Sequence, residues 1–96
     1  MSPEFLGLVA AYILCSEAAA LRQLTADETR QCLGLYQEIK LELVPGLTPE
    51  DFAALTPKDR AWVNREGYRA YREWRMANAD MVAQSEQEAR QLLALR

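Results

Sequence analysis

The stretch LTADE, residues 24–28, separates two apolar segments and contains a complete helix-start signal. The Thr25 hydroxyl can accept a hydrogen bond from the backbone N–H of Glu28, and the Glu28 carboxylate can accept one from the backbone N–H of Thr25. This capping box predicts that one helix ends just before Thr25 and that the next begins at Ala26.

The two helices around this turn are bounded by further signals. Ser2 is a candidate N-cap, and Pro3 occupies the first helical position, where proline is well tolerated. The sequence VPG at 44–46 stops the second helix. Because so short a connection forces neighbouring helices to run antiparallel, the sequence predicts a hairpin of helices 3–24 and 26–43.

A second start signal is repeated eight residues apart, in LTPED (47–51) and LTPKD (55–59). Each copy has threonine as the cap, proline at the first helical position and aspartate at the third. The first copy leads only to a short helical turn near 49–54, because Pro57 ends it. The second opens a helix that meets no later proline and is expected to run over 57–95, about 58 Å at 1.5 Å per residue.

These elements predict a single all-α domain over residues 1–96, with the hairpin packed on the long C-terminal helix. Half of the residues are apolar, which suits a globular core rather than disorder. Residues 1–5 are also consistent with a cloning remnant, since SPEF (2–5) is what a joined pair of common restriction sites encodes.

The uncharged segment FLGLVAAYILC, residues 5–15, allows two interpretations. It could be the apolar part of a signal peptide or anchor remnant, although no basic residue precedes it and Glu4 stands where a positive charge is usual. A buried first helix is the favoured interpretation. Its eleven residues fall short of the roughly 20 that cross a bilayer, so no stable membrane span is expected.

Composition excludes several kinds of chemistry. The chain has no histidine and two cysteines, which excludes Ser-His and Cys-His catalytic pairs and the commonest zinc sites. The four glycines are scattered and form no phosphate-binding loop. We therefore expect no catalytic residues, no metal, no cofactor and no enzymatic activity.

The net charge of −3 is unevenly distributed. Residues 1–57 hold eight acids and three bases, whereas residues 58–75 hold six bases and three acids. A dedicated nucleic-acid-binding protein is normally basic over a whole face. An acidic chain with one mildly basic segment therefore predicts no nucleic acid partner.

The basic segment has two different sides when it is drawn as a helix. The residues on its outer side that could bind a partner are Trp62, Arg65, Arg69 and Arg72. Arginine and tryptophan dominate the energetics of protein interfaces, so this side is a candidate surface for an acidic protein. The favoured interpretation of the periodicity is nevertheless a solvated basic face without a partner, in which Glu66 and Glu73 partly neutralise Arg69.

The opposite side of the same helix is an apolar seam. Its members are Val63, Gly67, Tyr71, Trp74, Asn78, Met81, Val82, Ser85, Ala89 and Leu92. Tyr71 and Trp74 are expected in the core. Gly67 costs about 1 kcal/mol of helix stability relative to alanine, so it is expected to allow the close approach of another helix. Asn78 and Ser85 either fix register or oligomeric state, or meet solvent near a helix bend.

Cys15 and Cys32 lie nine and eight residues from Leu24, at almost the same height on opposite arms of the predicted hairpin. Their Cβ atoms could then approach to about 4 Å, which predicts a disulfide bond. The alternative is a pair of buried free thiols, because cysteine also behaves as a small apolar residue. A disulfide favours an oxidising compartment.

The sequence therefore favours a small helical protein–protein interaction module, such as an extracytoplasmic inhibitor, immunity-type protein or adaptor, in the periplasm or secreted. A cytoplasmic adaptor or chaperone is one alternative, which free thiols would favour. An enzyme that clamps a small anion with Arg65, Arg69 and Arg72 is another, and it requires a concave pocket. A homodimer is also expected, because residues 5–15 and the long final helix need more burial than one chain supplies.

Overall fold

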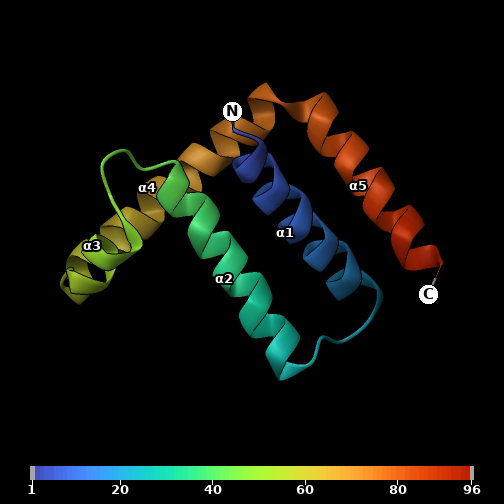
Figure 1. The fold of residues 1–96 in the computed structure, drawn as a ribbon, viewed down its shortest axis with the longest axis horizontal. Coiled ribbons are helices and arrows are strands. Elements are labelled where there is room, and N and C mark those ends of the chain that lie inside the picture. Colours follow the sequence, from blue (N-terminus) through green and yellow to red (C-terminus); the bar gives the residue numbers. More distant parts are fainter. Residues whose placement is uncertain (1, 96) are drawn as a thin grey trace.

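The computed structural model describes residues 2–95, and no strand occurs in this range. Its helices are α1 (Pro3–Leu21), α2 (Ala26–Glu42), α3 (Pro49–Ala54), α4 (Pro57–Ala77) and α5 (Ala79–Ala94). Helix α1 packs between α2 and α5, while α4 crosses behind α2 and the N-terminal end of α1 and packs on α2 (Figure 1). The predicted all-α fold, a helical hairpin on a C-terminal helical segment, is confirmed.

The helix starts lie where the threonine signals predict them. The backbone N–H of Glu28 donates to the Thr25 hydroxyl at 3.1 Å, and the Glu28 carboxylate accepts from the backbone N–H of Thr25 at 2.9 Å. Thr48 and Asp51 form the same reciprocal pair at the start of α3. Thr56 caps α4. Each cap satisfies a backbone N–H group that a helix start otherwise leaves unpaired.

Cys15 and Cys32 link the two arms of the hairpin as a disulfide, with their Cα atoms 5.8 Å apart. This separation is within the range that disulfides require, and it agrees with the mirrored placement of the two residues about the turn. The bond fixes the register of α1 against α2 near the middle of both helices.

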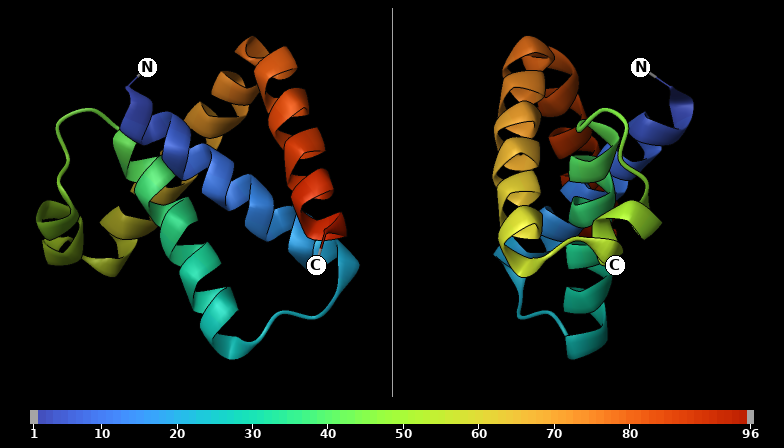
Figure 2. Two further views of the ribbon diagram at one scale, coloured as in Figure 1. Left: turned by 45° about the vertical axis from the view of Figure 1, so that its right-hand side comes forward. Right: turned by 90° about the vertical axis from the view of Figure 1, so that its left-hand side faces the viewer.

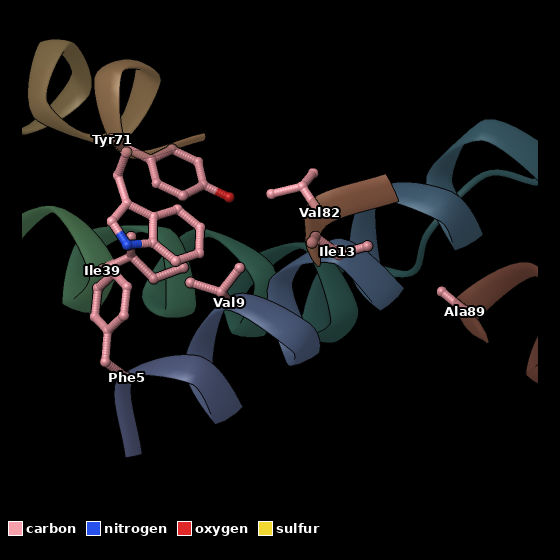
Figure 3. Close-up of a cluster of buried hydrophobic side chains, with 8 residues drawn as sticks. Phe5, Val9, Ile13, Ile39, Tyr71, Val82 and Ala89 are labelled. Atoms are coloured by element: carbon pink, nitrogen blue, oxygen red, sulfur yellow. The ribbon is translucent and has the colours of Figure 1, made fainter. Parts of the chain in front are cut away.

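The core is built from four of the helices (Figure 3). Its central contact is between Phe5 of α1 and Trp74 of α4, whose ring centroids are 5.3 Å apart in an edge-to-face arrangement. Tyr71 stacks on Trp74 from the same helix, and Ile39 of α2 is fully buried beside them. The expectation that Tyr71 and Trp74 belong to the core is confirmed.

The predicted continuous helix over 57–95 is wrong, because the chain bends at Asn78 and forms two helices. Asn78 has φ −123° and ψ 36°, outside the helical region, and its side-chain Nδ2 donates to the Trp74 carbonyl oxygen at 2.8 Å. A straight helix of about 58 Å would also exceed the longest dimension of the molecule, 43 Å.

The bend lets α5 return beside α1 (Figure 2). Val82 and Ala89 of α5 enter the core beside α1, and Arg90 forms an ion pair with Glu17 at 2.5 Å. The direction of α5 after the bend also determines which of its side chains are buried. Met81 and Leu92, both expected in the apolar seam, are about half exposed, whereas Val82 and Ala89 of the same predicted seam are buried. Of the two interpretations of Asn78, the helix bend describes this structure.

Gly67 brings α4 and α2 into close contact, as its place in the seam predicts. A Cβ atom added at Gly67 would lie 2.6 Å from Lys40 Cβ and 3.2 Å from Lys40 Cα. The Cα and Cβ atoms of Lys40 therefore lie against the backbone of α4. The Lys40 Nζ atom lies 4.6 Å from the centre of the Tyr36 ring in its own helix. Burial lowers the pKa of the Lys40 ammonium group.

Candidate protein-binding surface on α4

The side of α4 that faces away from the core carries the predicted binding residues. We call this set the outer stripe, and it consists of Trp62, Arg65, Arg69 and Arg72. All four are exposed, and the Trp62 side chain is 54% exposed. The opposite side of α4 is held in the core by Val63, Tyr71 and Trp74. The stripe is therefore presented on a helix whose position is fixed by packing.

Arg69 is already paired within its own helix. Its guanidinium lies 2.8 Å from Glu66 Oε2 and 2.7 Å from Glu73 Oε1. The hydrogen bond to Glu66 is the main cause that raises the pKa of Arg69, and Glu73 adds to it. The positive charge at the centre of the stripe is therefore balanced by two carboxylates, as the sequence spacing indicates.

Arg65 and Arg72 carry the charge that remains available. Neither forms an ion pair with any residue in the range 2–95. The Arg72 guanidinium lies 5.8 Å from the centre of the Tyr68 ring, which is itself about half exposed. Such a cation–π contact orients an arginine without neutralising it.

Met76 extends this surface, although it is absent from the predicted set. It is 77% exposed, and it lines a shallow hollow of 230 Å³ together with Arg69, Arg72 and Glu73. Its spacing, four residues after Arg72 and seven after Arg69, is the signal that places it on the same side. Exposed methionine side chains adapt easily to different apolar partners.

The geometry gives little support to an anion-clamping enzyme. The three arginines project outward from one helix, and the hollow at Arg69 and Arg72 also contains the Glu73 carboxylate. Glu66 and Glu73, the carboxylates that could serve such an enzyme as an acid, are both paired with Arg69. Within residues 2–95, no group of three or more His, Cys, Asp or Glu side chains is placed to hold a metal ion.

Helix α1 is unusual for its apolar composition. It is the one described helix whose length and mean hydropathy, 1.6, would suit a membrane crossing, and 22% of that stretch is buried. Phe5, Val9 and Ile13 enter the core, while Leu21 at its C-terminal end is exposed. A core helix or a signal sequence can have the same composition.

No protein-family model, curated protein or solved structure matches this chain.

Proposed function

We propose that this protein is a small helical protein–protein interaction module, and that the outer stripe of α4 binds an acidic surface on a partner protein. The observation that carries the proposal is the exposure of Trp62 on a helix fixed in the core. Arg65 and Arg72 on the same side form no ion pair within residues 2–95. Tryptophan and arginine are the residues most enriched among interface hot spots.

The rigidity of α4 supports this role. The helix is held by Trp74 against Phe5 and by the close contact of Gly67 with Lys40. A surface that is ordered before binding loses less conformational entropy when a partner docks. We therefore expect the backbone of α4 to keep its position when a partner docks.

The residues of the stripe are not equivalent in this proposal. Arg65 and Arg72 supply charge that no carboxylate in the described chain balances, and Trp62 supplies apolar area. Arg69, in contrast, already forms ion pairs with Glu66 and Glu73. We therefore expect Trp62, Arg65 and Arg72 to contribute more to binding than Arg69.

Quantitative affinity capture from the source organism, followed by measurement with the purified partner, tests the proposal. Trp62→Ala, Arg65→Ala and Arg72→Ala should each weaken binding by about tenfold or more. Arg30→Ala is the control for charge, because this variant also loses one exposed arginine, on α2, where Arg30 pairs with Asp27. Association should slow as salt rises, since exposed charges are screened over about 10 Å at 0.1 M. A partner that binds all of these variants equally well would show that the stripe is only a solvated face.

The disulfide supports an oxidising location, in the periplasm or outside the cell. A cytoplasmic adaptor or chaperone is the alternative that free thiols would favour. Non-reducing mass spectrometry of protein purified from its natural compartment separates the two, because a bonded pair is two hydrogen masses lighter than a pair of thiols.

We propose self-association separately from the outer stripe. Leu6, Leu8, Tyr12 and Leu14 of α1 are only partly buried, and apolar surface that remains open to solvent often marks an interface. We expect sedimentation at micromolar concentration to show a dimer. A monomer at that concentration would contradict the expected homodimer and would leave the stripe proposal standing.

A further inference from the structure

A groove separates the C-terminal end of α2 from α3. Its volume is 560 Å³, within the range of about 300–1,000 Å³ that is typical of binding sites. Its apolar lining comes from Leu41, Val44, Leu47 and Phe52. The last three are only partly buried, so apolar area remains open to solvent inside the groove.

The chain holds this groove open through local signals. Gly46 has a φ of +76°, which favours glycine, and it turns the chain away from α2 after Pro45. Thr48 then starts α3. Helix α3 stands at the end of the molecule away from α5 (Figure 1), and none of its residues is buried. A short, well-capped helix therefore serves as a wall of the groove and adds little to the core.

The polar part of the groove is acidic. Glu38 and Glu42 line it one helical turn apart, and neither forms an ion pair within the described range. None of the described lining residues is basic. Like charges at this spacing destabilise a helix slightly, so the pair is unfavourable for the folded chain alone. Gln37, also in the lining, has a buried Nε2 without a hydrogen-bond partner.

We propose that this groove binds a basic amphipathic segment of a partner protein. The apolar side chains of the segment contact Leu41, Leu47 and Phe52, while its lysine or arginine side chains pair with Glu38 and Glu42. Laying an amphipathic helix into an apolar groove is a common mode of peptide recognition. The site is opposite in charge to the outer stripe and lies on different helices, so the proposal does not depend on the stripe.

Titration of ¹⁵N-labelled protein with a defined peptide tests this assignment. The probe is a helical peptide of about 15 residues built from leucine and lysine at helical spacing. Its control is the same peptide with every lysine replaced by glutamate. We expect the lysine peptide to shift the amide resonances of residues 37–52, and the glutamate peptide to leave them unchanged.

Two sets of variants make the result specific. Glu38→Gln with Glu42→Gln should weaken peptide binding by about three- to tenfold, as expected for two exposed charge pairs. Phe52→Ala should also weaken it, and the variant should still fold because Phe52 lies outside the core cluster. Asp80→Asn with Glu88→Gln removes two carboxylates from α5 and should change nothing.

Three outcomes would overturn the proposal. Shifts centred on α1, α5 or the outer stripe would place the peptide elsewhere. If the groove variants and the α5 variants weakened peptide binding equally, the net charge of the protein and not the groove would explain the binding. Resonances of residues 37–52 that move with protein concentration alone would identify a second copy of this chain as the occupant.

Discussion

Gly67 of α4 lies directly against Lys40 of α2, so close that a methyl group at position 67 would stand 2.6 Å from Lys40 Cβ. That atom is next to the backbone and cannot move aside as the end of a long side chain can. The contact therefore fixes how near the two helices approach, and it connects the core to the helix that carries the outer stripe.

Gly67→Ala should lower the free energy of unfolding by about 1–3 kcal/mol, because the added methyl group separates α4 from α2. Gly34→Ala is the matched control, since nothing lies within 4 Å of a Cβ atom at Gly34. Alanine there should raise stability by about 0.5–1 kcal/mol through helix propensity alone. Urea midpoints followed by circular dichroism measure both changes. A gain of stability in both variants would show that α2 and α4 do not pack as described.

Trp74→Ala should destabilise the protein by about 3–5 kcal/mol, as expected when a large core side chain is removed. Arg69→Ala should change stability by less than about 1 kcal/mol, because its two ion pairs are exposed to solvent. Thermal melts of both variants under the same buffer compare the two sides of α4. The reverse order of effects would mean that the buried and exposed sides of the helix have been exchanged.

The hydrogen bonds of Glu28 predict that the stability of the fold depends on pH in the acidic range. The side-chain hydrogen bonds from Arg22, followed by the backbone hydrogen bond from Thr25, lower the pKa of Glu28 from 4.5 to about 2. Because the folded-state pKa is lowered, the ionised carboxylate stabilises the fold above about pH 4.5, and this contribution disappears as the pH falls towards 2.

Glu28→Gln removes that ionisation. The difference in the free energy of unfolding between wild type and variant should be largest at neutral pH and should shrink between pH 4.5 and pH 2. Denaturant midpoints of both proteins across this window provide the measurement. A difference that stays constant at every pH would contradict the role assigned to the carboxylate.

The disulfide closes a loop with a sequence separation of 17 residues. Reduction should therefore lower the free energy of unfolding by about 3 kcal/mol. Urea midpoints with and without a reductant measure the effect, and the double variant Cys15→Ser, Cys32→Ser should not respond to the reductant. An identical midpoint for the oxidised and reduced wild type would exclude a stabilising cross-link.

Local chemistry explains which parts of this fold can be predicted from the sequence. Thr25, Thr48 and Thr56 start helices through hydrogen bonds to residues only three positions away, so their roles are visible in short motifs. The pairing of Cys15 with Cys32 follows from one further step, the symmetry of the hairpin about its turn.

The bend at Asn78 depends on more distant contacts. Asparagine permits a break but does not require one, and the break is favoured because α5 can then cover Val9 and Ile13 of α1. Met81 and Leu92, which periodicity places in the buried seam, are about half exposed. The outer stripe is predicted by periodicity within a single helix. The groove beside α3 is not, because its walls come from separate elements.

The packing of α1 between α2 and α5 has a consequence for synthesis of the protein. Val9 and Ile13 leave the ribosome before α5, the helix that packs beside α1, has been translated. Chains emerge at roughly 5–20 residues per second, so the first helix waits several seconds with an apolar side uncovered. During that interval it is open to capture by chaperones, by a membrane surface or by another nascent chain. A C-terminal truncation before α5 would make this exposure permanent, and aggregation would be the expected result.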